Sequence, residues 1–91
     1  MHLLIPYDIS DDKRRRVVDK ILSHYGTRVN YSVFEVELSK PKFRKLIIAL
    51  ENNTHKKHDH VRIYVLGKES LKKSFILHRE KKVFEHEVLY F

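Results

Sequence analysis

The sequence has no cysteine among its 91 residues, and it has only two glycines and two prolines. Without cysteine the chain forms neither disulfides nor thiolate metal sites, which fits an intracellular protein. The scarcity of glycine and proline argues against disorder, because hydrophobic residues make up 42% of the chain, enough for a core. The length allows one domain and not two. Because so small a domain buries a limited share of its surface, we expect pairing with a second copy to help stabilise it.

Long hydrophobic runs are also missing. No stretch approaches the roughly 18 apolar residues that a membrane span needs. The first residues lack the basic region and the long apolar run of a signal peptide. We therefore expect a cytoplasmic protein that makes no use of a membrane.

Negative charge is in short supply relative to positive charge. The chain has 19 lysines and arginines against 12 acidic residues, a formal net charge of +7, and its isoelectric point is about 9.7. This surplus favours anionic partners, above all the backbone of nucleic acids. Solubility is the plain alternative explanation, and charge alone does not separate the two.

The first half of the chain predicts a strand, a helix and a further extended segment. The apolar run over 2–8 indicates a buried strand. Ser10 or Asp11 can cap the helix that follows, and its apolar residues recur at helical spacing. We expect Gly26 to stop this helix in a left-handed conformation. The segment 28–38 alternates apolar and acidic residues, which fits one long bent strand or two tightly joined strands.

The second half predicts another helix and more strands. Ser39 can cap a helix that carries Pro41 in its first turn. The apolar stripe of that helix consists of Phe43, Leu46, Ile47 and Leu50. After a polar, histidine-rich loop over 52–60 we expect a strand over 61–66, a turn or short helix over 68–73, and a strand over 83–91.

Two amphipathic helices that alternate with strands predict an α+β fold. The pattern suits a ferredoxin-like two-layer sandwich over 1–91, in which both helices cover one face of an antiparallel sheet. The strands also carry apolar residues on the other face, and the segment 83–91 is hydrophobic for a tail. A second copy is the simplest cover for that surface, so we expect a homodimer, with 83–91 in a dimer or partner contact.

Asp8 is the first candidate for chemistry, because it lies where a buried strand gives way to a helix. A carboxylate there can simply cap the helix or order the loop. If the strands meet across a two-fold axis, however, two copies of Asp8 would face each other. One or two carboxylates, with water and phosphate oxygens, are a common way to hold Mg²⁺. Such an ion can polarise a phosphodiester and activate water.

Basic residues follow directly, at Lys13, Arg14, Arg15 and Arg16. At 3.6 residues per turn they fan around the helix, so at most two of them can point at one ligand. As a group they can neutralise phosphates, although for each one alone a solvated helix face is the plainer interpretation. Arg28 and Ser32 add polar groups at a strand entrance. Further basic clusters lie at 40–45 and 68–82.

A histidine cluster and the known catalytic motifs offer less. His55, His58 and His60 have a spacing that suggests zinc, but a structural zinc site usually needs four ligands, and no cysteine is present. The chain has no glycine-rich phosphate loop and no signature of Ser-His-Asp catalysis.

Two sequence blocks resemble the Cas-two family of CRISPR-associated proteins, small proteins of spacer acquisition. The first block is YDISDDKRRR over 7–16. The second begins with YG at 25–26 and continues as RVNYSVFE over 28–35 and Leu38. The two blocks have the family's usual separation. The segment VRIYVL over 61–66 resembles a later strand of the family.

The resemblance implies a ferredoxin-like fold, a symmetric dimer, and Asp8 as the metal-binding and catalytic carboxylate. Some members are credited with Mg²⁺-dependent (or Mn²⁺-dependent) endonuclease activity on RNA or double-stranded DNA. In other members the protein is a scaffold between dimers of the Cas-one integrase. The family pattern also implies phosphate-site or supporting roles for Tyr7, Arg15, Arg28, Ser32 and Phe34.

Two positions depart from the family pattern, and other functions remain open. Pro6 stands where many members have a β-branched or other apolar residue, and Val36 replaces a residue that is often small. Proline cannot donate to a sheet ladder and is unexpected in a central strand. A non-catalytic scaffold, a toxin-type ribonuclease similar to the virulence-associated D family, and a ferredoxin-like regulatory domain are the alternatives.

Overall fold

The computed structural model describes residues 1–80, 83 and 84 of the chain. In chain order the elements are β1 (His2–Asp8), α1 (Asp12–Tyr25), β2 (Gly26–Asn30), β3 (Val33–Glu37), α2 (Lys40–Asn52), β4 (His60–Val61), β5 (Tyr64–Leu66) and α3 (Lys68–Lys73). The segment 28–38 thus holds the end of one strand and the whole of a second. The strand predicted over 83–91 lies, from residue 85 on, outside the described residues, and Val83 and Phe84 are in a turn.

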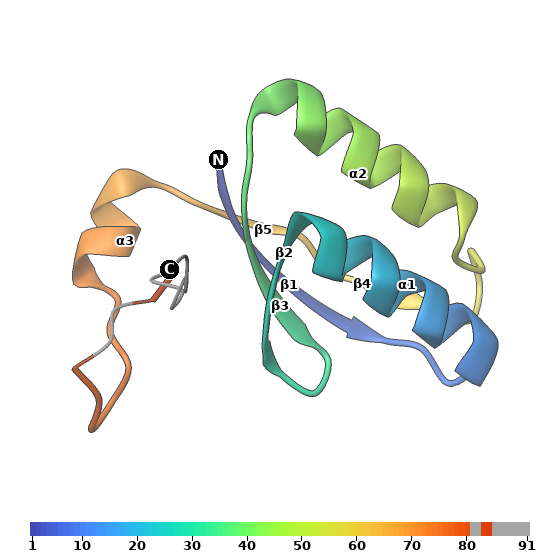
Figure 1. The fold of residues 1–91 in the computed structure, drawn as a ribbon, viewed down its shortest axis with the longest axis horizontal. Helices are drawn as coiled ribbons and strands as arrows, with labels where there is room; N and C mark the ends of the chain where they lie inside the picture. The colour runs from blue at the N-terminus through green and yellow to red at the C-terminus, as the bar shows by residue number, and fades with distance from the viewer. Residues whose placement is uncertain (81–82, 85–91) are drawn as a thin grey trace, which may run out of the picture.

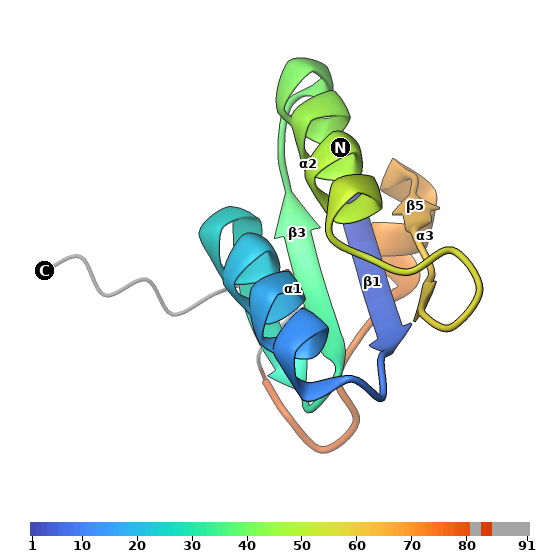
Figure 2. The same cartoon turned by 90° about the vertical axis from the view of Figure 1, so that its right-hand side faces the viewer.

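The strands form one antiparallel sheet in the order β2-β3-β1-β4, and β5 also pairs with β1. Both long helices lie over the same face of this sheet, as the two views in Figures 1 and 2 show. This arrangement confirms the predicted ferredoxin-like two-layer sandwich. Among the described residues, no helix combines the length and the apolar content needed to cross a membrane.

The core lies between the sheet and the two helices. Every second residue of β1 is buried, because side chains along a strand alternate between its two faces. The helices bury the apolar residues that recur at helical spacing. The fully buried side chains are Leu3, Ile5, Val18, Leu22, Phe34, Val36 and Leu46. Burying one such side chain contributes roughly 1.5–3 kcal/mol to folding.

Capping residues fix where the helices begin. The Asp11 carboxylate accepts a hydrogen bond from the backbone N–H of Arg14 at 2.9 Å. The Ser39 hydroxyl accepts one from the backbone N–H of Lys42 at 3.5 Å, and Pro41 stands in the first turn of α2. Both start signals were predicted, with Asp11 rather than Ser10 as the first cap.

Gly26 ends α1, but the predicted left-handed conformation is wrong. Its φ and ψ angles are −155° and −161°, which is extended backbone, and it begins β2. Glycine is required here because the strands approach closely. A Cβ atom at this position would lie 2.4 Å from the Glu35 carbonyl oxygen and 2.5 Å from Val36 Cγ2.

The strand predicted over 61–66 is divided into β4 and β5, and Pro6 explains the break. The Pro6 carbonyl accepts a hydrogen bond from the Arg62 backbone N–H at 2.9 Å. In a strand, the N–H and C=O of one residue point to the same side, so the donor that proline lacks would also face this neighbour. Pairing therefore stops opposite Pro6, whereas β1 itself runs unbroken to Asp8.

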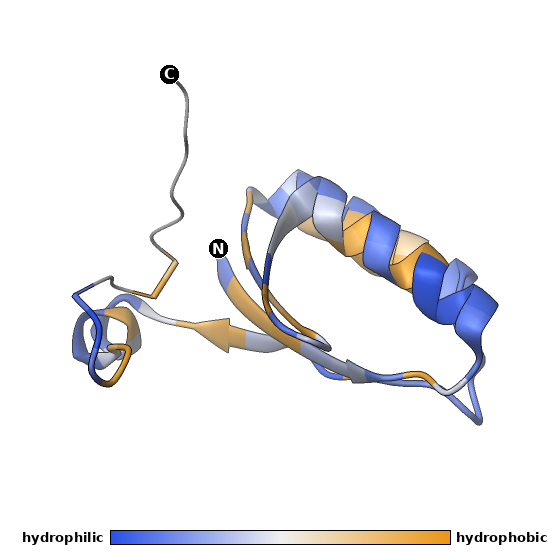
Figure 3. Ribbon diagram, turned by 60° about the horizontal axis from the view of Figure 1, so that its bottom comes forward, coloured by the Kyte–Doolittle hydropathy of each residue, from blue (hydrophilic) through white to orange (hydrophobic). Residues whose placement is uncertain are grey.

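None of the helices in the described part of the chain lies over the second face of the sheet. There, β1 contributes His2, Leu4, Pro6 and Asp8, the residues that alternate with its buried ones. Near the start of the strand, the backbone N–H of Phe84 donates to Glu35 Oε1 at 2.8 Å. The Phe84 ring also meets the edge of the His2 ring, with 5.1 Å between centroids. The edge strand β5 is strongly hydrophobic (Figure 3), although Val65 is 58% exposed.

Candidate metal and nucleic-acid site

Asp8 ends β1 on the uncovered face of the sheet, and its side chain is exposed. Within the described residues its carboxylate makes no hydrogen bond and no salt bridge. The helix cap beside it is supplied by Asp11 and not by Asp8. The capping role that the sequence allowed for Asp8 is therefore taken by another residue, and its oxygens are available to a ligand.

Two residues that the sequence analysis did not connect with Asp8 lie beside it. His60 is directly opposite Asp8 in the pairing of β1 with β4. Arg62 follows two residues later on the same face, and its backbone N–H bonds to Pro6. A small cavity of about 150 Å³ is lined by Pro6, Tyr7, Asp8, His60 and Arg62. The sequence shows that His60 and Arg62 alternate with apolar residues along this strand. It does not show the strand register that places them beside Asp8.

The donor set at Asp8 fits a divalent ion, although one chain does not complete it. A carboxylate oxygen is a ligand that Mg²⁺ and Mn²⁺ favour. In the part of the chain that the structure describes, no group of three His, Cys, Asp or Glu side chains is placed to hold a metal. This finding also removes a three-histidine zinc site at His55, His58 and His60. A metal held at Asp8 would therefore need further ligands, from neighbouring side chains, water, substrate or a second protomer.

Tyr7 points to the helix-covered side and joins α1 to β2. Its hydroxyl hydrogen-bonds to the Asp19 carboxylate and accepts from Arg28 Nη1 at 3.3 Å. Burial, reinforced by the bond to Asp19, raises the pKa of Tyr7. Arg28 Nη2 lies 3.3 Å from Asp19 Oδ2. Burial lowers the pKa of Arg28, but the hydrogen bond to Tyr7 and the negative charge of Asp19 raise it, and the net result is a raised pKa. Tyr7 therefore supports the end of β1 from the face opposite Asp8.

The predicted residues of the second block surround the turn between β2 and β3. The Arg28 guanidinium lies 4.9 Å from the Phe34 ring centroid and also bonds to the Tyr31 carbonyl. The Ser32 carbonyl accepts from the Tyr7 backbone N–H at 3.0 Å, which fixes this turn beside the end of β1. Phe34 is fully buried in the core. Its support for the site acts through the packing of the strands, because its side chain is closed to a ligand.

Two of the consecutive arginines are engaged within the protein. Arg14 Nε and Nη2 donate to Asp59 at 2.7 and 3.2 Å, and the Asp59 side chain is wholly inaccessible to solvent. The hydrogen bond from Arg14 holds the pKa of Asp59 below its usual range. Arg15 donates to Asp12 at 2.5 Å and to the Ile9 carbonyl at 3.2 Å. Arg14 thus ties α1 to the α2–β4 loop, and Arg15 orders the turn after Asp8.

Three other cations of α1 have no such engagement. Lys13, Arg16 and Lys20 are exposed, and none has a carboxylate partner among the described residues. Residues three and seven positions apart lie on one face of a helix. At 1.5 Å per residue, these three span about 10 Å, close to three phosphate-to-phosphate steps along one strand of a duplex. We call these three residues the α1 stripe.

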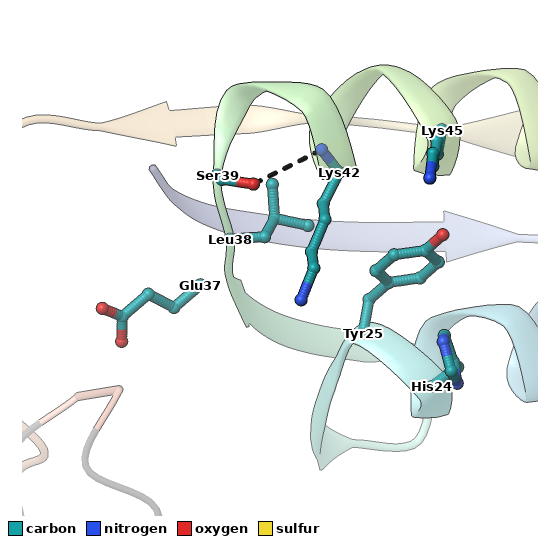
Figure 4. Close-up of a pocket in the computed structure, with 7 residues that line it drawn as sticks. All are labelled: His24, Tyr25, Glu37, Leu38, Ser39, Lys42 and Lys45. Carbon is teal, nitrogen blue, oxygen red and sulfur yellow. Dashed lines mark hydrogen bonds between the residues drawn. The ribbon is translucent and has the colours of Figure 1, made fainter.

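The end of the α1 stripe leads to a second basic surface. A cavity of about 330 Å³ lies between the end of α1 and the start of α2, lined by His24, Tyr25, Glu37, Leu38, Ser39, Lys42 and Lys45. The Lys42 side chain extends toward this space, while the Glu37 carboxylate turns away from it (Figure 4). Glu37 instead lies 3.5 Å from the His2 ring nitrogen. Positive charge therefore continues from α1 onto α2.

Comparison with known proteins identifies the family. The family model for CRISPR associated protein Cas2 matches residues 1–74. The chain belongs to the Cas2 family. This confirms the resemblance seen in its two sequence blocks, and the match covers every helix and strand described above.

Individual relatives agree with this assignment. The chain is 44% identical over 68 residues to the "CRISPR-associated endoribonuclease Cas2 3" of Synechocystis. The aligned residues make up 75% of this chain and 74% of that protein. The crystal structure of Streptococcus pyogenes Cas2 superposes with a TM-score of 0.74 and 33% identity, covering 85% of this chain and 99% of the other. A chain in the solved structure of a partial Cas6-RT-Cas1–Cas2 complex superposes with a TM-score of 0.60 and 33% identity. The match covers 84% of this chain and 89% of that chain.

Proposed function

We propose that the protein acts in CRISPR adaptation as a homodimer that binds duplex DNA or RNA and hydrolyses phosphodiesters with a divalent cation at paired Asp8 residues. The observation that carries this proposal is the Asp8 carboxylate, exposed and without a partner among the described residues, at the strand end next to the basic start of α1. Membership in the Cas2 family and the endoribonuclease name of the Synechocystis relative support it. Such a protein works in the cytoplasm, where its nucleic acids are.

The uncovered face of the sheet supports dimerisation. Leu4, Pro6, Val33 and Leu66 are half-buried on this face or at its edge, and no described helix covers them. A second copy that packs on this face would bury these side chains and bring the two Asp8 residues toward a common axis. Each protomer would then supply one carboxylate to a shared site.

The cation would be Mg²⁺ or Mn²⁺. When bound, it would polarise the phosphodiester and lower the pKa of an attacking water. The residues of the chain would do the remaining work. Asp8 would hold the ion, Arg62 would face the phosphate from the same cavity, and Arg15 would keep the turn after Asp8 in place through its bond to the Ile9 carbonyl.

Nucleic acid would lie along the helices, where the α1 stripe supplies three cations without carboxylate partners. Lys42 and Lys45 extend the basic surface. Arg14, Arg15 and Arg28 contribute charge but are held by internal bonds. Ser32 lies on the turn beside the end of β1. Since these contacts are to phosphates, affinity would fall steeply with salt concentration.

The Cas1 integrase is the proposed protein partner, because a solved relative lies in a complex whose name includes Cas1. This gives a second function, a scaffold for integration that does not cleave. Family membership favours both functions over a toxin-type ribonuclease. An integrase gene and a repeat array beside the gene would exclude the toxin.

Asp8→Asn separates the nuclease from the scaffold. If the nuclease proposal is right, the variant loses Mg²⁺-dependent cleavage of RNA and duplex DNA, while Glu51→Gln, an exposed carboxylate on α2, cleaves like the wild type. Equal metal-dependent cleavage by wild type and Asp8→Asn would refute the nuclease. If neither cleaves and Asp8→Asn still supports spacer integration, the protein is a scaffold.

A further inference from the structure

His60 is the side chain that pairing places closest to Asp8 from another strand. The two residues are direct partners in the antiparallel pairing of β1 with β4. Directly opposed residues point to the same face, with Cβ atoms about 4.5–5.5 Å apart. Both side chains are exposed and both line the 150 Å³ cavity.

We propose that His60 is a second metal ligand beside Asp8, so that each protomer brings one carboxylate oxygen and one imidazole nitrogen to the ion. The inference rests on the proposed function, because it assumes that Asp8 binds a metal. Two protomers would then supply up to four protein ligands. That would explain how a chain without any group of three potential ligands among its described residues completes a site.

The chemistry of the pair sets the preferred ion. Mg²⁺ takes oxygen ligands almost exclusively, whereas imidazole suits first-row transition ions. A His60–Asp8 pair therefore selects a divalent transition ion over Mg²⁺. Arg62 shares the cavity and carries a positive charge, but its Nη1 donates to the Tyr64 hydroxyl at 3.3 Å. This bond directs the guanidinium along the strand, where it can meet a phosphate.

The test measures metal binding without substrate. Isothermal titration of the full-length protein with Co²⁺ and with Mg²⁺ compares wild type, Asp8→Asn, His60→Gln and the control His24→Gln, an exposed histidine at the far end of α1. Loss of even an outer-shell partner of a metal typically costs 10–100-fold in affinity, so loss of a direct ligand should cost at least as much. We expect His60→Gln to bind Co²⁺ at least about tenfold more weakly, with little change for Mg²⁺, and to alter the visible absorption of bound Co²⁺. His24→Gln should match the wild type.

The outcomes separate the two proposals. If Asp8→Asn loses Co²⁺ binding and His60→Gln binds Co²⁺ like the wild type with an unchanged spectrum, His60 is not a ligand, and the proposed function stands. If the wild type shows no Asp8-dependent metal binding, the metal site itself is refuted, and the role of His60 with it. Circular dichroism of each variant establishes that an observed loss is not unfolding.

Discussion

The α1 stripe gives the sharpest quantitative prediction, through the salt dependence of nucleic-acid binding. Each phosphate neutralised by a cation adds about −0.9 to the slope of log affinity against log salt concentration for a duplex. For each stripe in contact with the duplex, its three cations contribute about −2.7 to the slope. Between 50 and 200 mM salt, one stripe in contact then lowers affinity about 40-fold. For each stripe in contact, Arg16→Gln should reduce the magnitude of the slope by about 0.9 and the fall to about 12-fold.

Arg14→Gln is the matched control. It removes the same charge from a neighbouring position, but Arg14 is held by Asp59 and Arg16 has no carboxylate partner in the described part of the chain. Fluorescence anisotropy of a labelled duplex at several salt concentrations measures both slopes, and circular dichroism checks that both variants are folded. An equal change of slope in the two variants would refute the distinction between engaged and available arginines. A flat salt response of the wild type would refute phosphate binding altogether.

Three further predictions concern stability. Gly26→Ala should lower the free energy of unfolding by about 1–3 kcal/mol, because the added Cβ would meet the backbone of β3. Gly67→Ala is the control, since no atom lies within 4 Å of its added Cβ, and it should change the free energy of unfolding by less than about 0.5 kcal/mol. Chemical denaturation measures both changes. Asp59→Asn should lower the melting temperature at pH 7 by on the order of 5 °C. The pKa of Asp59 is depressed in the folded state, so the ionised carboxylate stabilises the fold at pH values above its unfolded pKa near 3.9. This stabilisation is lost as pH falls through the folded pKa. The difference in melting temperature between wild type and Asp59→Asn should therefore vanish in acid. Phe34→Ala should lower the free energy of unfolding by about 3–5 kcal/mol, measured by denaturant titration followed by circular dichroism.

The sequence was sufficient to predict the parts of the fold that depend on local patterns. Alternation along β1 and β3 and helical spacing in α1 and α2 identify the buried faces, and Asp11 and Ser39 indicate the helix starts. Effects that act across strands were not predicted in this way. Pro6 leaves its own strand intact and divides its neighbour, because its missing donor faces β4 and β5. Gly26 is needed for the close approach of β3 and not for a turn.

The sequence indicated the candidate site to the same extent. Asp8 stands out by its place at the end of an apolar run and by its motif. The ion pair between Arg14 and Asp59 joins residues 45 positions apart, and no local pattern indicates it. The same holds for His60, whose position opposite Asp8 depends on strand register. Which arginines remain available to phosphate, and which side chains flank Asp8, therefore required the structure.

The central claim is that two protomers bring their Asp8 side chains together, and site-directed cross-linking tests it most directly. Because the chain has no cysteine, Asp8→Cys introduces a single thiol. Ser23→Cys, on the exposed surface of α1, is the control. With a short bis-maleimide in dilute solution, we predict a covalent dimer from Asp8→Cys and monomer from Ser23→Cys. A dimer from Ser23→Cys with only monomer from Asp8→Cys would contradict the shared site.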